Sequence, residues 1–400
     1  MKSQRPLNVL VLSGVFKGDR FIQQCHQRGA KVTVLTTEKH THDPWPRQCI
    51  EQLFAQPVRS PIEHTLNTVS YLMRSTRFDL VAPMDDYDVE VAAALREHLR
   101  LPGMGASRAR HFRDKLAMRL RAKEGGLPVP EFCPVFNYDQ LREFMARVPA
   151  PWMFKPRSEA SASGIRKLHD PEAVWRLLDE LGDKQSHFLL EQFVPGDICH
   201  VDSLISEGKV VFAEAHRCGA PPFEVTHGGG VWRTRTVERG TPEEKELCAL
   251  NKKVLATLGH QRGVAHTEFI KGQDGKLYFL ETAARVGGAF IAELVEASTG
   301  INLWEEWADL ELDQGQTPYQ LPTKRQEYGA VVVTLAKQQW PDLSGYADPE
   351  VHLRPRKEQH AALILRGKDV ERIDHLVEGY AVRFRQDFMT RAPAREGRAD

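Results

Sequence analysis

The first hundred residues alternate apolar runs with amphipathic segments. Residues 7–13 and 31–36 are continuous apolar runs, and residues 19–28 between them have helical spacing. Such runs are typical of parallel strands that are covered on both faces. The alternation continues with a helix near 62–76, a strand at 78–83 and a helix near 88–99. This pattern predicts a small, doubly wound parallel-sheet domain.

After this domain, a basic segment at 107–124 has helical spacing and ends at Gly125-Gly126. Shorter alternating segments follow, which predict strands. The expected strands cover 151–155, 164–168, 188–194, 198–206 and 209–216, and the expected helices cover 170–182, 243–258, 289–299 and 303–311. Residues 326–388 alternate strands with a helix, and the last ten residues are expected to fray.

Two alternating segments, 266–270 (HTEFI) and 277–282 (LYFLET), flank an Asp274-Gly275 turn signal. If this dipeptide forms a two-residue hairpin loop, Glu268 lies directly opposite Glu281. Carboxylates whose Cβ atoms are roughly 4.5–5.5 Å apart repel each other, so the hairpin needs a cation. A hard, oxygen-binding ion such as Mg²⁺ suits this pair. A loop of another length would turn the glutamates toward solvent.

Arg285 follows the second glutamate by four residues, and Gly287-Gly288 then opens an expected helix. An arginine and the free N–H groups of a helix start both bind anions. This segment therefore predicts an anion-handling site beside the cation.

Composition restricts the class of protein. With 41% apolar and 27% charged residues, the chain is typical of a globular protein with two or three domains. Lys plus Arg equals Asp plus Glu at 54 each, so no overall field favours nucleic acid or an anionic membrane. The six cysteines form no CxxC pair and the histidines show no ligand spacing, so neither predicts a metal centre. The N-terminal apolar run is too short for a signal peptide, and we expect a cytoplasmic protein.

Two weaker signals suit a nucleotide. Lys155 ends an expected strand and precedes a loop of small residues whose N–H groups could close over phosphate oxygens. An ordinary surface loop is equally compatible with this segment. Extended backbone near 191–194 could supply the donor and acceptor that a purine edge needs, and Asp197 could meet ribose hydroxyls, although an ordinary hairpin has the same pattern. Gly14 and Gly18 lack the full dinucleotide fingerprint and shape a loop or turn.

Candidate substrate residues lie in two places. Residues 215–235 read as an irregular segment in which Arg217 could bind a carboxylate and His227 could accept a proton, or both could be ordinary structural residues. Asp85 and Glu90 follow a parallel strand, where open sheets bind ligands, and could hold an ammonium group. For Asp85, capping of the following helix is the favoured alternative.

Five segments in this order resemble the ATP-grasp superfamily over roughly residues 5–390. They are DKLAMR (114–119) leading to GLPVP, FKP (154–156) with its small-residue loop, LLEQFVPGD (189–197), HTEF (266–269) and FLETAARVGG (279–288). The thirteen-residue spacing of the glutamates also resembles that family.

The resemblance implies an ATP-grasp fold with mixed α/β and α+β character. It implies an N-terminal doubly wound parallel-sheet domain, a small central lid domain and a C-terminal mixed-sheet domain. The expected divisions are an N-terminal domain at 1–104, ATP-grasp parts at 105–195 and 196–325, a small α+β subdomain at 326–390 and a flexible tail at 391–400.

The same resemblance implies a role for each motif residue. Glu268 and Glu281 hold magnesium, one or two ions that Mn²⁺ could replace, and Arg285 stabilises the transferred phosphoryl group, with Gly287 and Gly288 beside it. The ATP-binding residues implied are Lys115, Lys155, Ser158, Ser161, Ser163, Gly164, Glu191, Gln192, Phe193, Val194 and Asp197. Ala283 stands where many members have an asparagine that helps to hold a second ion, and Ile198 stands where the ribose-binding acid is usual.

Within the superfamily, FLETAARVGG and PGDICHVDSLI look most like carboxylate-amine ligases such as the L-amino acid ligases. The implied activity is ATP-dependent amide formation between small carboxylate and amine substrates through an acyl phosphate, with ADP and phosphate released. The alternatives are another acceptor, as in a carboxylase or acid-thiol ligase, and a non-catalytic ATP sensor. The resemblance makes a homodimer plausible, and no nucleic-acid or membrane partner is expected.

Overall fold

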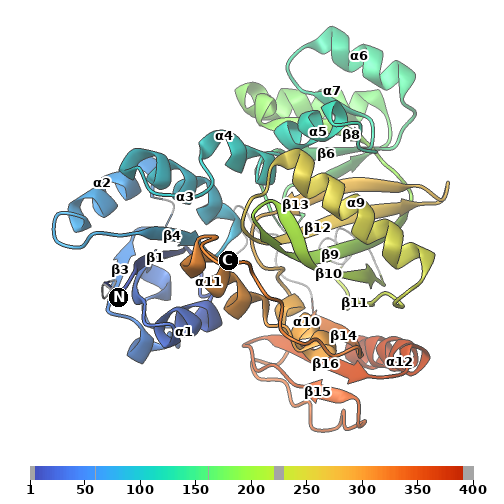
Figure 1. The fold of residues 1–400 in the computed structure, drawn as a ribbon. Coiled ribbons are helices and arrows are strands. Elements are labelled where there is room, and N and C mark those ends of the chain that lie inside the picture. Colours follow the sequence, from blue (N-terminus) through green and yellow to red (C-terminus); the bar gives the residue numbers. More distant parts are fainter. Residues whose placement is uncertain (1–4, 59, 161, 220–228, 391–400) are drawn as a thin grey trace.

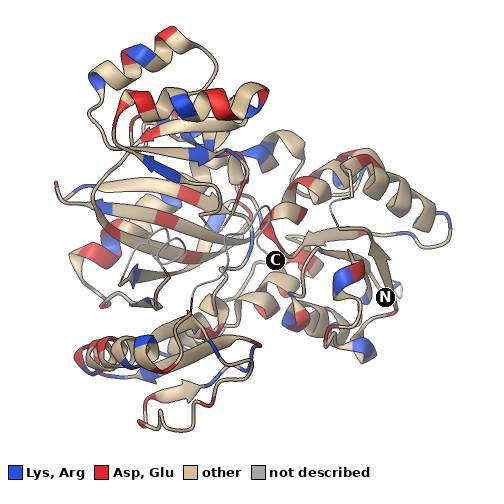
Figure 2. Cartoon of the chain, turned by 180° about the vertical axis from the view of Figure 1, so that it is seen from behind, with Lys and Arg blue, Asp and Glu red and all other residues tan. Residues whose placement is uncertain are grey.

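The computed structural model describes residues 5–58, 60–160, 162–219 and 229–390, which form three sheets with helices packed on them (Figure 1). Acidic and basic residues are interspersed over these elements instead of gathering on one basic face (Figure 2). Among the described residues, no helix combines the length and apolar content that crossing a membrane requires.

The N-terminal unit confirms the expected parallel sheet. Its strands run in the order β3-β2-β1-β4, and every pairing is parallel. They are β1 (Asn8–Ser13), β2 (Lys31–Thr37), β3 (Gln52–Gln56) and β4 (Leu80–Pro83), with the helices α1 (Asp19–Gln27), α2 (Ile62–Leu72) and α3 (Asp86–Leu99). Leu10, Val11 and Val34 are fully buried, as expected for strands that are covered on both faces.

The basic segment expected as one helix at 107–124 is broken. It forms α4 (Ala106–Ala109), a 3₁₀ turn at Arg110–Phe112 and α5 (Lys115–Glu124). The break has a local cause, because the side chain of Asp114 accepts hydrogen bonds from the N–H groups of Leu116 and Ala117 and so caps a new helix. The cap makes Lys115 the first residue of α5.

A small antiparallel sheet in the order β5-β8-β6-β7 forms the next unit. It contains β5 (Phe132–Pro134), β6 (Trp152–Pro156), β7 (Arg166–Leu168) and β8 (Phe188–Gln192), with α6 (Tyr138–Arg147) and α7 (Pro171–Leu181) beside it. The pattern analysis did not identify β5 or α6. Trp152 and Phe154 are buried in the core that these elements share.

The largest sheet has eight strands in the order β13-β12-β9-β10-β11-β14-β16-β15. They are β9 (Gly196–Ser206), β10 (Lys209–Cys218), β11 (Trp232–Thr236), β12 (Gly263–Gly272), β13 (Leu277–Ala283), β14 (Tyr328–Leu335), β15 (Val351–Leu353) and β16 (His360–Gly367). Part of the segment expected to be irregular at 215–235 is therefore strand β11. The expected subdomain at 326–390 supplies β14 to β16, which continue this sheet, and α12 (Val370–Asp387), which packs on it.

The remaining helices are α9 (Pro242–Leu258), α10 (Ile291–Thr299) and α11 (Leu303–Asp313). Helix α11 packs against α1, where the rings of Phe21 and Trp307 have centroids 5.0 Å apart. These two side chains belong to one buried cluster that contains residues of the parallel sheet and of β9 and β12. This shared core holds the N-terminal unit against the large sheet.

Gly196 is required where β9 passes β12, because a Cβ there would lie 2.2 Å from the carbonyl oxygen of Lys271. We expect Gly196→Ala to destabilise the fold by roughly 1–3 kcal/mol, because backbone must move to admit the methyl group. Thermal unfolding measures the change. The matched control is Gly379→Ala at an exposed position of α12, where a Cβ meets nothing within 4 Å. This change should be neutral or stabilising. Equal melting temperatures for Gly196→Ala and wild type would contradict the steric argument.

Candidate active site

Glu268 and Glu281 face each other across β12 and β13, as expected, but the loop and strand geometry that pairs them differs from the expected one. The loop has three residues, 273–275, with Gly272 N–H donating to Lys276 C=O and Gly275 at φ 80°. This loop alone would shift the pairing by one residue. A bulge at Leu280 adds one residue to β13 and restores the Glu268–Glu281 pair. The expectation of a two-residue loop is wrong, whereas the facing pair is confirmed.

Lys115 provides a cationic partner for this pair. Its Nζ lies 2.9 Å from Oε2 of Glu281 and donates to the carbonyl of Glu159 at 2.7 Å. Burial would raise the pKa of Glu281, but the charge of Lys115 and its hydrogen bond, together with Lys155 and Arg119, lower it. The start of α5 therefore places a positive charge directly against one of the two carboxylates.

Lys155 and Glu191, expected at the phosphate and adenine ends of a nucleotide, contact each other. Both are buried, and the Glu191 carboxylate accepts from Lys155 Nζ and, at 2.7 Å, from Nε of Arg119. Burial alone would raise the pKa of Glu191, but the two cations lower it. Arg119 also lies over the Phe279 ring, with 5.7 Å between Cζ and the centroid, so it bridges the small and large sheets. Pattern analysis missed Arg119 because a helical arginine is usually exposed.

An apolar patch lies on the same face of the large sheet as Glu268. Alternation along a strand puts residues two apart on one face, so Ile198 and Ile270 share a face with His200 and Glu268. The patch consists of Ile198, Cys218 and Ile270, with Val194, Trp232, Tyr278 and Leu280 packed against them. One face thus combines an apolar surface with the paired carboxylates.

The remaining residues of the expected hinge lie beside this patch. The N–H groups of Gln192 and Phe193 donate to the carbonyls of Glu131 and Pro151, and Lys167 Nζ lies 3.5 Å from the centroid of the Phe193 ring. The structure does not bring Asp197 to the patch. Asp197 is exposed, and it precedes Ile198, so its side chain leaves the opposite face of β9.

The small-residue loop after β6 lies against the N-terminal unit. Ser158 C=O accepts from Arg113, and the Tyr87 hydroxyl donates to Glu159 at 2.8 Å. Gly164 has φ 69°, which a glycine adopts without strain. Ser163 lies in the same loop, and Ser161 lies outside the described residues.

Arg285 is held by the N-terminal unit. Its Nε donates to Oδ2 of Asp86 at 2.7 Å, and Arg113 lies 3.7 Å from the other carboxylate oxygen. Burial would raise the pKa of Asp86, but the charges of Arg285 and Arg113 lower it to about 2. The expected alternative for Asp85 is confirmed, because it caps α3 and pairs with Lys17. The acid that contacts Arg285 is Asp86, the residue after Asp85. The sequence MDDYD contains both acids, but nothing in it shows which of them contacts Arg285.

The other candidate substrate residues are dispersed. Glu90 lies one helical turn after Asp86 in α3 and is partly exposed. Gly287 lies close to Asp202, because a Cβ atom at Gly287 would be 3.0 Å from Oδ1 of Asp202. Gly288 precedes α10 and its carbonyl accepts from the N–H of Ile291. His227 lies outside the described residues.

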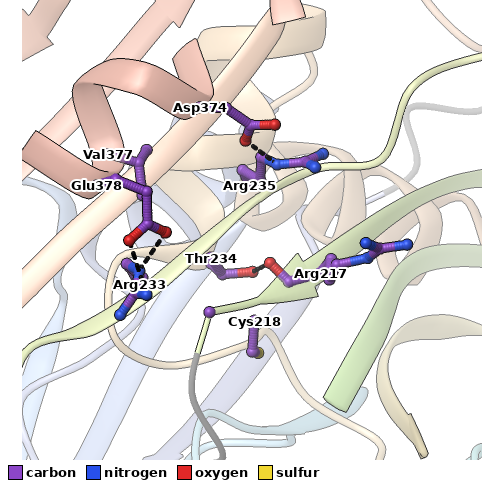
Figure 3. A pocket seen from close by; sticks show the side chains of 9 residues that line it. Arg217, Cys218, Arg233, Thr234, Arg235, Asp374, Val377 and Glu378 are labelled. Atoms are coloured by element: carbon purple, nitrogen blue, oxygen red, sulfur yellow. Dashed lines mark hydrogen bonds and ion pairs between the residues drawn. The ribbon is translucent and has the colours of Figure 1, made fainter. Parts of the chain in front are cut away.

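Arg217 and Glu268 lie on opposite faces of the large sheet, so the structure does not bring them together. Arg217 pairs with Arg235 across β10 and β11, whereas the next residue, Cys218, belongs to the patch. Arg217 lines a cavity of about 250 Å³ beside α12, where Arg233 and Arg235 face Glu378 and Asp374 of that helix (Figure 3). Each of the three arginines has an acidic partner. The ion pairs are Arg217–Glu243, Arg233–Glu378 and Arg235–Asp374. Sequence spacing could not reveal this, because the face depends on the strand register.

Comparison with known proteins agrees with this architecture. A model of the ATP-grasp domain family matches residues 120–289. The L-arginine-specific L-amino acid ligase of Bacillus subtilis is 24% identical over 234 residues, which are 57% of this chain and 56% of the ligase. A D-alanine–D-alanine ligase of Neisseria gonorrhoeae is 24% identical over 250 residues, covering 60% of this chain and 81% of that ligase. The chain thus aligns with little more than half of the first of these relatives.

Solved structures share the fold over nearly the whole chain. The L-amino acid ligase of Bacillus licheniformis superposes with a TM-score of 0.76 at 17% identity, covering 98% of this chain and 100% of that one. The structure of an N5-carboxyaminoimidazole synthetase of Staphylococcus aureus in complex with ADP superposes with a TM-score of 0.72 at 15% identity, covering 95% of this chain and 98% of that one. These likenesses show the fold.

The Asp86–Arg285 contact predicts a pH dependence. Its carboxyl pKa of about 2 lies below the ordinary 3.8, so the stabilisation is complete above pH 4 and is lost as the pH falls toward 2. We expect Asp86→Asn to lower the free energy of unfolding by about 2 kcal/mol at neutral pH and by less at pH 3. Urea unfolding across this range measures the difference. Asp139→Asn, on exposed α6, should show no such trend. A pH-independent deficit in Asp86→Asn would contradict the assignment.

Proposed function

Because a model of the ATP-grasp domain family matches residues 120–289 and the chain shares its fold with a solved L-amino acid ligase, we propose that the protein is an ATP-dependent carboxylate-amine ligase. It joins two small, amino-acid-like substrates through an amide bond and releases ADP and phosphate. The observation that carries this proposal is the facing pair Glu268 and Glu281, with Lys115 against Glu281, beside an apolar patch on the same sheet face. The names of the ligases that resemble the chain support it.

The donor set fits magnesium-bound ATP. Glu268 and Glu281 offer only carboxylate oxygens, which Mg²⁺ and Mn²⁺ prefer, and both glutamates face one side of the hairpin. An ion held by these two carboxylates would neutralise charge on the phosphate oxygens. Lys115 and Lys155 are the lysines that would hold phosphates, and the loop carrying Ser158, Ser163 and Gly164 would close over them. The apolar patch with Val194 would hold the adenine ring.

The reaction moves the γ-phosphoryl group from ATP to a carboxylate oxygen of the first substrate. The amine nitrogen of the second substrate then attacks the acyl carbon, loses a proton and displaces phosphate. Arg285 lies four residues after Glu281, and Asp86, which also pairs with Arg113, orients its guanidinium. An arginine held in this way can stabilise the charge of the transferred group without rearranging first. The backbone at Gly287 and Gly288 would receive the substrate carboxylate.

Glu281→Gln should abolish ADP formation and leave the fold intact, because the amide cannot replace a charged metal ligand. The measurement incubates the protein with Mg-ATP and an amino-acid panel, and mass spectrometry identifies ADP, AMP and coupled products. Glu246→Gln, an exposed change on α9, is the control. Retained turnover in Glu281→Gln would remove the metal role. For wild type, formation of AMP would indicate an adenylate-forming enzyme. A product that contains bicarbonate or a thiol would indicate another acceptor. ATP binding without turnover would indicate a sensor.

Arg285→Lys should lower kcat by roughly 10²-fold with a smaller change in KM for ATP, because the loss falls on the transition state. Lysine retains a positive charge for Asp86, so the contact between units persists. Steady-state kinetics measure both constants. Arg262→Lys, whose arginine pairs with exposed Glu207, should behave as wild type. A change in KM alone would refute the role of Arg285.

A further inference from the structure

Three histidines from three strands of the large sheet converge on one buried carboxylate. Nδ1 of His200 lies 2.7 Å from Oδ2 of Asp202, Nδ1 of His266 lies 2.9 Å from Oδ1, and Nδ1 of His216 lies 3.4 Å from Oδ2. Asp202 and His216 have no exposed surface, and His200 and His266 are also buried. The ring centroids of His200 and His216 are 4.7 Å apart, and those of His200 and His266 are 5.0 Å apart.

The outer nitrogens of two rings already have polar partners. Nε2 of His266 lies 3.4 Å from Oε1 of Glu268, which is a carboxylate and can only accept. Nε2 of His200 lies 2.8 Å from Oγ1 of Thr234, whose hydroxyl donates to the carbonyl of Arg217 at 3.2 Å. The Thr234 hydroxyl lies closer to Nε2 of His200 than to that carbonyl, so its single proton can be given to either of them. Protons on both Nε2 atoms are one arrangement that satisfies these contacts, and this arrangement leaves both Nδ1 lone pairs facing Asp202.

The two Nδ1 atoms face Asp202, and a cation placed between them and the carboxylate could use both lone pairs. In the arrangement with both Nε2 atoms protonated, the alternative to such a cation is a second proton on each ring. Two protonated imidazoles packed 5.0 Å apart in a buried site would repel each other. One divalent ion supplies the same two positive charges at a single point, with every imidazole neutral.

His216 is the second, independent observation. Neither of its ring nitrogens has a hydrogen-bond partner among the described residues, although its side chain is completely buried. A buried polar group without a partner costs roughly 1–3 kcal/mol. Nδ1 of this ring lies 3.4 Å from the carboxylate that the other two rings share, where a metal ion would use its lone pair.

We propose that His200, His216, His266 and Asp202 bind one divalent transition-metal ion, for which zinc is the best fit. Three imidazole nitrogens and one carboxylate are a usual tetrahedral zinc set. Zinc at about 2.0–2.1 Å from each ligand separates ligand atoms by about 3.3 Å. The His216–Asp202 distance of 3.4 Å matches this spacing, and the other two contacts need to open by roughly half an ångström. The ligand atoms of His200, His266 and Asp202 already lie within 4.8 Å of one another, so His216 is the ring that must turn toward the shared point.

The surroundings match those of bound zinc. Metal-binding histidines almost always donate their other N–H to a carboxylate or similar acceptor, and here Glu268 and Thr234 occupy those positions. The ion is distinct from the proposed magnesium, because imidazole nitrogens favour zinc whereas Glu268 and Glu281 offer only oxygen. Because Nε2 of His266 contacts Glu268, a zinc ion on Nδ1 of the same ring would help to orient the Glu268 carboxylate.

The experiment uses the untagged full chain, produced with added zinc, washed with a weak chelator and measured by elemental analysis. We expect one zinc per chain, and cobalt substitution should give the strong visible absorption of a tetrahedral site. His216→Leu removes a ligand that has no hydrogen-bond partner, so it should keep the fold and weaken zinc binding at least tenfold in competition with a coloured chelator. Glu281→Gln should keep the zinc, as should His260→Leu, which changes a buried histidine outside the cluster.

Wild type without stoichiometric zinc would overturn the proposal, as would an octahedral cobalt spectrum. Zinc bound as tightly by His216→Leu as by wild type would also overturn it. If His216→Leu does not fold, the zinc content and cobalt spectrum of wild type decide. Loss of zinc in Glu281→Gln would place the ion between the glutamates instead and contradict the assignment. All these readouts are independent of ligase activity, so failure of the proposed reaction leaves this test intact.

Discussion

The arrangement of the site depends on two carboxylates that the backbone forces together. Glu268 and Glu281 occupy opposite positions on neighbouring strands, where like charges destabilise the pair unless cations compensate. Lys115 from the start of α5 contacts Glu281, and Lys155 and Arg119 add positive charge from the small sheet and α5. The requirement for charge compensation therefore draws separate parts of the chain to one hairpin.

The same principle holds the N-terminal unit at the site. Asp86 lies just beyond a parallel strand and is buried against Arg285 and Arg113. Removing one partner of a buried ion pair is far more costly than the pair is stabilising, because it leaves a charge without compensation. The contact therefore couples the position of Arg285 to the docking of the N-terminal unit, and with it the geometry of the proposed phosphoryl transfer.

Strand alternation divides the large sheet between two tasks. One face carries the apolar patch, the paired glutamates and the histidine cluster around Asp202. The other face packs against α9 and α12 and contains Arg217 with its compensated cavity. A shift of one residue in any strand would exchange these sets, so the bulge at Leu280 matters as much as the two glutamates.

The sequence by itself determined the parallel N-terminal sheet and most strands and helices, because apolar periodicity is a local property. It predicted that Glu268 lies opposite Glu281, but it did not determine the three-residue loop and the Leu280 bulge that produce this pairing. It also did not determine the break before Lys115 or strand β11. Only the tertiary structure decided which distant charges meet, as for Asp86 with Arg285 and Lys155 with Glu191. It alone gathered three histidines around Asp202, because strand order and register, and not spacing along the chain, set which side chains share a face.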